Sequence, residues 1–338
     1  MVVVFPRIIL AELNTHRVFS RNSASSRAIP FRKMVKMVKE DPFIPIAFQE
    51  DHSGMQGTSY FNEKDSKILR EKHLKGRDRA IETALDMASG IFDKDEVFEF
   101  NENGELITKQ DVVGVTKQIV NRYLEPFMWH AAIITSTEWE NFFKLRCPQY
   151  TYKGKVFRSR KDWLSNTKKH FQWNGMSGKE AVKKDEFWQS INKGQGEIHI
   201  MALAEAMWDA KNESIPRELK AGEWHIPFGD NLKVLKLQAL YVSSSPNFEE
   251  PIENYYATLE NIALKVATAR CARVSYMNFE GKDDYEADLK LYEALSLSGH
   301  WSPFEHCAQA MEDSLFRGNF KGWKQLRKTF INEDGNHE

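Results

Sequence analysis

Residues 15–27, with the sequence THRVFSRNSASSR, are the feature that most limits what this chain can become. The segment holds one histidine, three arginines, four serines and one asparagine, with almost no apolar residue. Hydroxyl and amide groups form hydrogen bonds, and guanidinium groups bind phosphate or carboxylate through paired bonds. No acidic residue occurs between Glu12 and Glu40, so the local field is positive and suits an anionic ligand. On this chemistry alone, a solvated basic loop is an equal alternative.

Length and composition place the chain among globular proteins. Its 338 residues are 41% hydrophobic, which is enough for one large domain or two small ones. The net charge of −1 argues against a surface devoted wholly to nucleic acid. The cysteines Cys147, Cys271 and Cys307 form neither a disulfide framework nor a zinc-binding spacing. The apolar start is too short for a signal peptide, and no later run approaches membrane-spanning length. We therefore expect a soluble cytoplasmic protein with no membrane partner and no metal.

Hydrophobic periodicity predicts an α+β fold, because helical and strand-like patterns both occur along the chain. Asn-Glu-Asn-Gly at residues 101–104 is typical of a hairpin turn. We expect helices at residues 8–13, 31–38, 65–88, 112–124, 137–146, 197–211, 256–274 and 284–298. We expect strands at residues 2–5 and 232–241, a hairpin at 97–108, a polar loop through 15–27, and a strand followed by a helix from residue 308.

Residues 148–194 differ in composition from the rest of the chain. Lysine and arginine outnumber acidic residues there, and tyrosine, phenylalanine and tryptophan are interleaved with them. Basic residues mixed with aromatic ones can bind single-stranded nucleic acid. The alternative, which we favour, is a subdomain inserted at 148–194 whose aromatic side chains form a small core of their own.

A second polar cluster lies near the other end, with ARCARVSY at residues 269–276 and GHWSPFEH at residues 299–306. Taken alone, His300, Glu305 and His306 could bind a metal ion. That interpretation is weak, because the two histidines are not an i, i+4 pair and Pro303 lies between them. The simpler interpretation gives His306 a core or capping role.

Residues 15–27 resemble the signature of the flavin-dependent thymidylate synthases, Arg-His-Arg-x-x-Ser-x-Asn-x-x-Ser-x-Arg. Residues 269–276 and 299–306 resemble the amino-terminal part of that family, and residues 114–126, 135–146 and 196–204 resemble its carboxy-terminal helices. The order differs from that of most members, because the piece like 299–306 usually precedes the signature. The chain therefore looks like a circular permutation of the family's parts. The signature positions that match are His16, Arg17, Ser20, Asn22, Ser25 and Arg27.

The resemblance implies a single domain over residues 1–338, with mixed helices around a central antiparallel sheet. It implies methylation of deoxyuridine monophosphate (dUMP) to thymidine monophosphate (dTMP). Methylenetetrahydrofolate would supply the carbon, and FAD reduced by NADPH would supply the electrons. Family sites lie at the interfaces of a homotetramer, so we also expect an oligomer.

The same resemblance assigns roles to individual residues. Arg146 would face the pyrimidine, and His16 would lie beside the flavin; these two are the predicted catalytic residues. The predicted substrate-binding residues are Glu12, Ser25, Ser26, Arg27, Arg122 and Arg146, with the hydroxyls and arginines on the phosphate. The predicted FAD-binding residues are His16, Arg17, Asn22, Ser275, His300, Ser302 and Glu305.

Four departures from the family pattern leave the substrate open. Thr15 stands in place of an arginine, Glu12 in place of a common glutamine, and Ser23 in place of a frequent glutamate. Residues 148–194 follow Arg146 where a histidine-containing turn is usual. These changes allow a cytosine nucleotide as substrate or a hydroxymethyl group in the product. A relative that binds single-stranded nucleic acid without catalysis, and a structural oligomer with decayed sites, are the alternatives from other classes.

Overall fold

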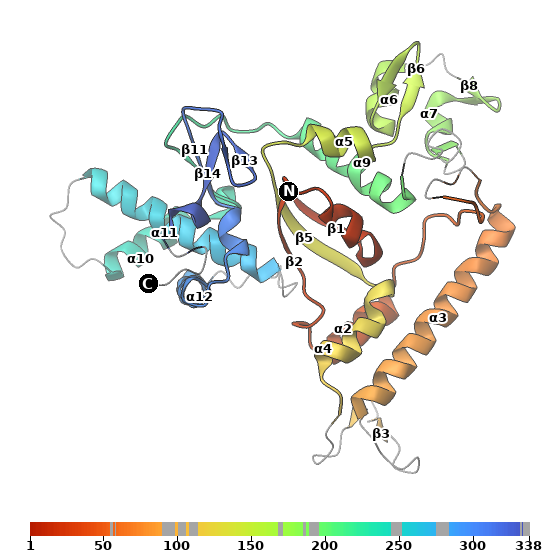
Figure 1. The fold of residues 1–338 in the computed structure, drawn as a ribbon, viewed down its shortest axis with the longest axis horizontal. Helices are drawn as coiled ribbons and strands as arrows, with labels where there is room; N and C mark the ends of the chain where they lie inside the picture. Colours follow the sequence, from red (N-terminus) through yellow and green to blue (C-terminus); the bar gives the residue numbers. More distant parts are fainter. Residues whose placement is uncertain are drawn as a thin grey trace.

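The computed structural model describes residues 1–54, 57, 59–89, 99–100, 106–107, 114–167, 172–184, 187–188, 196–244, 252–274, 284–331 and 333. At its centre lies a three-stranded antiparallel sheet in the order β1-β5-β2 (Figure 1). The strands are β1 (Val2–Pro6), β5 (Trp129–Thr135) and β2 (Ser20–Ser23). Helices and further small antiparallel sheets surround it, so the fold class is α+β, as the sequence predicts.

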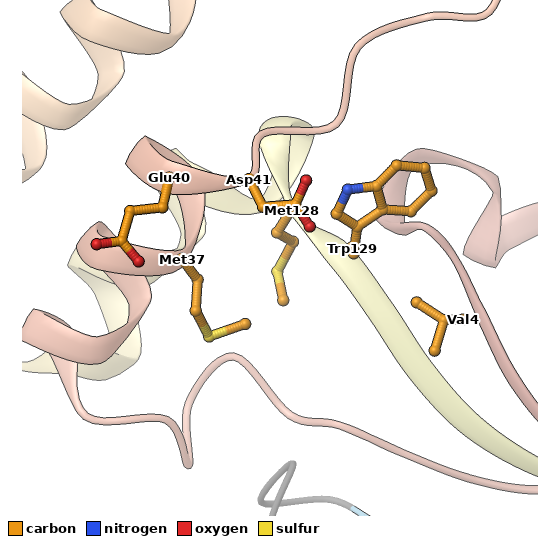
Figure 2. Close-up of a pocket in the computed structure, with 6 residues that line it drawn as sticks. All are labelled: Val4, Met37, Glu40, Asp41, Met128 and Trp129. Carbon is orange, nitrogen blue, oxygen red and sulfur yellow. The ribbon is translucent and has the colours of Figure 1, made fainter.

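The edge strand β1 shows the alternation expected of a half-buried strand. Val3 and Phe5 are buried, whereas Val2 and Val4 are 44% and 58% exposed on the opposite face. The predicted strand is confirmed, but it is buried on one face only. On the open face, a cavity of about 560 Å³ lies beside Val4 (Figure 2). Its other lining residues are Met37, Glu40, Asp41, Met128 and Trp129.

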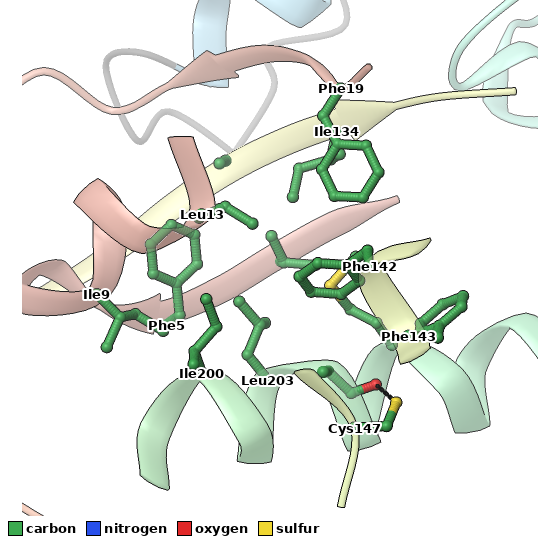
Figure 3. Packing of buried hydrophobic residues seen from close by; sticks show 14 residues of the cluster. Phe5, Ile9, Leu13, Phe19, Ile134, Phe142, Phe143, Cys147, Ile200 and Leu203 are labelled. Carbon is green, nitrogen blue, oxygen red and sulfur yellow. Dashed lines mark hydrogen bonds between the residues drawn. The ribbon is translucent and has the colours of Figure 1, made fainter. Parts of the chain in front are cut away.

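The other face of the sheet carries the main hydrophobic core. It is covered by α1 (Leu10–Asn14), α5 (Glu140–Arg146) and α9 (Ile198–Glu213). Figure 3 shows the aromatic rings of α5 and the aliphatic side chains of α9 packed beneath the strands. Burying each such side chain stabilises the fold by about 1.5–3 kcal/mol, so this layer fixes α1, α5 and the sheet as one unit. Buried residues of the layer include Phe5, Leu13, Phe19, Ile134, Phe142, Phe143, Ile200 and Leu203.

The predicted polar loop at residues 15–27 contains a strand, β2, which is a correction. Its four residues pair with β5 from Ser20↔Thr135 to Ser23↔Ala132. Their composition is poor for a strand, since serine and asparagine favour turns. The partner strand, more than 100 residues further along the chain, supplies the hydrogen bonds that make the segment extended.

A helical layer packs against the start of β5. It consists of α2 (Phe31–Glu40), α3 (Glu63–Ser89), α4 (Lys117–Val120) and the 3₁₀ helix η2 (Asn121–Phe127). Gly76 does not interrupt α3, which confirms the long helix. The predicted helix at 112–124 is correct only in part: α4 is short, and the chain continues as η2 with Pro126 inside it. Proline lacks the N–H that an α-helix interior requires, which explains the change of helix type.

The segment at residues 232–241, predicted as a strand, is part of helix α10 (Val234–Ser244). Leu237, Leu240 and Tyr241 follow one another at helical spacing and pack against α11 (Ile252–Arg273). The composition of this segment suits a strand. It is helical because a helix places these three apolar side chains on one face, which packs against α11. The helix α12 (Tyr285–Leu297) joins the same lobe, at the left of Figure 1.

The carboxy-terminal lobe also contains short strands where one strand and a helix were predicted. A sheet in the order β10-β11-β14 joins Trp224–His225, Ala308–Ala310 and Trp323–Gln325. The hairpin β12–β13 pairs Phe316–Arg317 with Phe320–Lys321, and 3₁₀ helix η6 (Leu326–Thr329) follows β14. The 3₁₀ helix η5 (Ser302–Glu305) lies between α12 and β11. It contacts β2, which brings the lobe to the central sheet.

The remaining elements are short. The 3₁₀ helix η1 (Arg7–Ile9) links β1 to α1, and η3 (Gly229–Asn231) precedes α10. The predicted hairpin at 97–108 is present as β3 (Glu99–Phe100) paired with β4 (Leu106–Ile107). Among the described residues, no helix has the length and apolar character needed to cross a membrane.

Within residues 148–194, short elements surround a cluster of buried aromatic rings. The elements are β6 (Tyr150–Tyr152), β7 (Lys155–Phe157), α6 (Arg160–Thr167), β8 (Gln172–Trp173), β9 (Met176–Ser177) and α7 (Gly178–Ala181). Tyr150, Trp163, Phe187 and Trp188 are buried together against Ile198 and Met201 of α9. Glu205 of α9 fastens the segment, accepting hydrogen bonds from Tyr150 Oη (3.2 Å), Arg160 N (2.6 Å) and Trp188 Nε1 (2.9 Å).

Candidate functional site

The strand β2 connects the signature segment to the carboxy-terminal cluster. Asn22 is buried, and its Nδ2 donates to the carbonyl oxygen of Cys271 at 2.5 Å. Its Oδ1 accepts a hydrogen bond from Ser302 Oγ at 3.0 Å, across 280 positions of sequence. Two predicted cofactor-binding residues, one from each polar cluster, therefore touch.

Ser20, two positions earlier on the same face of β2, makes a second connection. Its Oγ accepts hydrogen bonds from Gln325 Nε2 at 2.8 Å and from Asn319 Nδ2 at 2.9 Å. Gln325 Nε2 also donates to the carbonyl oxygen of Glu305 at 3.1 Å. These bonds fix β2, η5 and β14 relative to one another. The alternation of side chains along a strand explains why Ser20 and Asn22 both face this lobe.

Arg21 and Glu305 bring opposite charges to this region. Arg21 Nη1 donates to the carbonyl oxygens of Leu13 and His16, each at 3.1 Å. Burial and the charge of Arg17 lower the pKa of Arg21, while the charge of Glu305 opposes that shift. Glu305 Oε1 accepts a hydrogen bond from Arg327 Nη1 at 2.6 Å. Glu305 is thus within electrostatic reach of the signature and is held in place by Arg327.

His16, itself a signature residue, is buried and contacts the other predicted catalytic residue. Its ring packs edge-on against Phe142 at 4.9 Å between centroids, and its Nε2 accepts from Arg146 Nε at 3.2 Å. Burial, followed by the charges of Arg146 and Arg21, lowers the pKa of His16 to about 4. The imidazole is therefore neutral at pH 7 and free to act as an acceptor. It orients the Arg146 guanidinium while leaving the terminal nitrogens unused by this bond.

Glu12 occupies the same neighbourhood with an unsatisfied carboxylate. Its Oε2 is buried and has no hydrogen-bond partner among the residues that the structure describes. Burial, followed by the charge of Glu197, raises the pKa of Glu12, and Arg146 acts in the opposite direction. A buried acceptor without a donor is costly, so Glu12 has unused hydrogen-bonding capacity at this position.

Glu197 was not predicted as a site residue. Its Oε2 accepts from the backbone N–H groups of His199 (2.7 Å) and Ile200 (3.1 Å), capping α9. Its Oε1 lies 2.5 Å from His199 Nδ1, and His199 Nε2 accepts from Ile46 N at 3.0 Å. The signal in the sequence is its position at the start of the predicted helix at residues 197–211, where a carboxylate is favourable.

Two of the residues predicted to hold a phosphate, Ser26 and Arg122, lie around Glu125, another residue that the sequence did not single out. Ser26 Oγ donates to Glu125 Oε1 in a short hydrogen bond. Arg122 Nη1 lies 3.9 Å from the same oxygen, and Arg7 Nη2 lies 3.5 Å from it. Ser25 is half-buried and Arg27 is exposed. Ser26 and Arg122 therefore lie together, but on a carboxylate of the chain itself.

Among the described residues, two predicted cofactor-binding residues, His300 and Arg17, have no hydrogen bond to this network. His300 is exposed, and its Nδ1 lies 2.8 Å from Ser298 Oγ; within the described part of the chain, no contact links it to His16. Arg17 is also exposed. Ser275 lies outside the described residues. The cavity beside Val4 has none of the predicted site residues in its lining.

The metal interpretation finds no support in the side chains. His306 is fully buried, and its Nδ1 lies 2.8 Å from Thr135 Oγ1, whereas His300 is at the surface. Across the described residues, no group of three or more His, Cys, Asp or Glu side chains could hold a metal ion. His306 has the core role of the simpler interpretation.

The aromatic side chains of residues 148–194 bear on the nucleic-acid alternative. Bases stack on exposed aromatic faces. Tyr150, Trp163, Phe187 and Trp188 are at most 2% exposed and pack on one another instead. This burial favours the interpretation in which they form a core.

Fold and side chains thus define an α+β protein with a polar network centred on β2, and they do not by themselves define a family. No family model, curated protein or solved structure matches the chain.

Proposed function

We propose that this protein is a flavin-dependent thymidylate synthase, which methylates dUMP to dTMP at the C5 position of the base. The observation that carries the proposal is the hydrogen bond between Asn22 and Ser302. It joins the two segments whose sequences resemble the family, although the chain presents them in the opposite order. This contact supports the proposal, because a chance resemblance of two short motifs gives no reason for them to lie against each other.

The side chains around β2 fit a flavin in chemical type. FAD offers a diphosphate for cationic groups, and a polar ring edge and ribityl chain for hydroxyl and amide groups. Arg17 and Arg21 supply positive charge, and Asn22, Ser302 and Glu305 supply hydrogen-bonding groups. When bound, FAD would carry electrons from NADPH to the carbon that methylenetetrahydrofolate delivers. The exposure of His300 is consistent with its serving the site of another protomer in a homotetramer.

The nucleotide would be held by residues on two sides. Ser25, Ser26, Arg27 and Arg122 would bind the phosphate through charge-assisted hydrogen bonds. Arg146 would face the pyrimidine, where its guanidinium favours negative charge that develops on the ring. Because His16 accepts from Nε of Arg146, the guanidinium plane is fixed before substrate arrives.

Arg146→Lys is expected to lower the rate of product formation by about 100- to 1000-fold while leaving the fold intact. Lysine keeps the charge but loses the planar fork and the bond to His16 Nε2. The measurement is product formed per enzyme, read by mass spectrometry. Lys144→Ala, an exposed change on the same helix, is the control and should leave the rate unchanged. An Arg146→Lys variant with more than half of the original rate would contradict this role.

A second candidate substrate, a deoxycytidine nucleotide, is favoured by Glu12. Its buried Oε2 lacks a donor, and the exocyclic amino group of cytosine is a donor where uracil has an acceptor. Glu12→Gln replaces one acceptor oxygen by an NH₂ donor. If cytosine is the natural base, this variant should shift preference toward dUMP.

The test incubates purified protein with FAD, NADPH and methylenetetrahydrofolate, and with either dUMP or deoxycytidine monophosphate. The proposal predicts a nucleotide heavier by one CH₂ group. A product heavier by one CH₂O group would instead indicate hydroxymethylation. Protein that binds FAD and is reduced by NADPH, yet converts neither nucleotide, would overturn the proposed activity.

A further inference from the structure

The carboxylate of Glu125 stands where three donors converge. Ser26 Oγ, Arg122 Nη1 and Arg7 Nη2 all lie around one oxygen, Glu125 Oε1. Arg7 comes from η1, Ser26 from the signature segment and Arg122 from η2. Three segments distant in sequence thus present cationic and hydroxyl donors to a single point.

The donors are held in place by other contacts. Asn121 Nδ2 donates to the carbonyl oxygens of Ser26 (2.6 Å) and Ile29 (2.9 Å), which fixes the loop that carries the hydroxyl. Arg7 Nη1 lies 3.3 Å from the ring nitrogens of His130. Burial, with the charge of Arg7, lowers the pKa of His130 to about 3, so this ring is neutral at pH 7. The donor set is therefore preorganised.

The donor set also exceeds what one carboxylate needs. Two arginines face one glutamate, and the exposed guanidinium of Arg27 lies one residue from Ser26. A phosphate monoester, with up to two negative charges and three terminal oxygens, matches two or three arginines and a hydroxyl better than a single carboxylate does. Glu125 is 18% exposed at its side chain, which gives it a path to solvent.

We propose that Arg7, Ser26 and Arg122 form a phosphate-binding site, and that Glu125 occupies it in the ligand-free protein until a phosphate monoester displaces it. The inference rests on the proposed function in one respect, because it identifies this phosphate as that of the nucleotide substrate. It adds Arg7 as a phosphate ligand and Glu125 as an internal competitor. Competition by a carboxylate lowers affinity for any anion and disfavours weak, singly charged ones.

A purely structural ion pair is the other interpretation of the same contacts, and Glu125→Gln separates the two. Glutamine keeps an acceptor oxygen for Ser26 but removes the charge that opposes phosphate. Binding of inorganic phosphate, measured by calorimetry in a low-salt buffer without other phosphate, should tighten about tenfold. Glu140→Gln removes an arginine-paired carboxylate elsewhere, beside Arg158, and should leave phosphate affinity unchanged.

Arg7→Met provides an independent test, because it removes a donor rather than the competitor. It should weaken phosphate binding about tenfold in the wild-type and Glu125→Gln backgrounds alike. Unchanged or weaker phosphate affinity in Glu125→Gln, or unchanged affinity in Arg7→Met, would overturn the site. So would the absence of phosphate binding in both the wild type and Glu125→Gln.

Two nucleotide ligands distinguish failure of this inference from failure of the proposed function. Glu125→Gln should tighten dUMP but not deoxyuridine, which lacks the phosphate. If the affinity for inorganic phosphate changes as expected in both variants while dUMP binds no better than phosphate, the phosphate site is supported and the proposed substrate is wrong. If dUMP binds and is methylated, but neither variant changes phosphate affinity, the enzyme stands and this site is wrong.

Discussion

Asp288→Ala is expected to destabilise the folded protein by about 3 kcal/mol. The Asp288 carboxylate is 1% exposed and bridges two arginines of α11, with Oδ1 2.7 Å from Arg273 Nε and Oδ2 3.3 Å from Arg270 Nε. Removing one member of a buried ion pair leaves uncompensated charge, at about 3–5 kcal/mol. The lower end of this energy range applies to Asp288→Ala, because both arginines keep partial contact with solvent.

The measurement is the free energy of unfolding from urea titration, with Glu286→Ala on the exposed side of the same helix as control. The control should change stability by less than about 0.5 kcal/mol. This cluster also supports the candidate site, since the end of α11 carries Cys271, whose carbonyl accepts from Asn22. A loss below about 1 kcal/mol in Asp288→Ala would show that the arginines do not depend on this carboxylate.

Acid is expected to destabilise the folded protein through its buried histidines, of which His130 and His306 are the most completely buried. Both are fully buried, and burial lowers the pKa of each from 6.5 to about 3. The unfolded chain takes up protons below pH 6.5, whereas the folded rings stay neutral until about pH 3. Their contribution to stability is therefore present above pH 6.5 and is lost as the pH falls toward 3. As the pH falls from 7.5 to 5, each of these histidines lowers the free energy of unfolding by about 2 kcal/mol. The two together lower it by about 4 kcal/mol.

Urea titrations at the two pH values test this, in the wild type and in His130→Gln and His306→Gln. Each variant should lose about 2 kcal/mol less than the wild type over the same interval. The comparison of variants is needed because buried carboxyls act in the opposite sense: burial raises the pKa of Glu205, so its contribution grows as the pH falls. His52→Gln, an exposed change, is the control. Equal pH dependence in all four proteins would contradict the assignment.

Local signals in the sequence explain the elements that could be predicted. Helix α12 begins where Asp284 Oδ1 accepts from Ala287 N at 3.0 Å, and the chain leaves it at Gly299, whose φ of +68° suits glycine. The strand β2 and the helix α10 could not be predicted in the same way. Pairing with β5 determines the first, and packing against α11 determines the second. In both cases the partner residues lie outside the short stretch of sequence over which hydrophobic periodicity is read.

The candidate site likewise contains residues that the sequence could identify and residues that only the fold could identify. A resemblance of motifs was enough to select Asn22 and Ser302, which touch. It did not select Arg7 or Glu125, because their relevance comes from an ion pair between residues 118 positions apart. Charged residues of this kind are common along any chain, and only the fold shows which of them converge on the signature.

The account depends on a flavin held between the segment around β2 and the segment around η5. The most direct measurement is the visible absorption spectrum of the purified protein after incubation with FAD and removal of free ligand, followed by addition of NADPH. The account predicts a yellow protein that NADPH bleaches, and a loss of bound flavin when Asn22 and Ser302 are both replaced by alanine. A folded, colourless protein that takes up no FAD would contradict it.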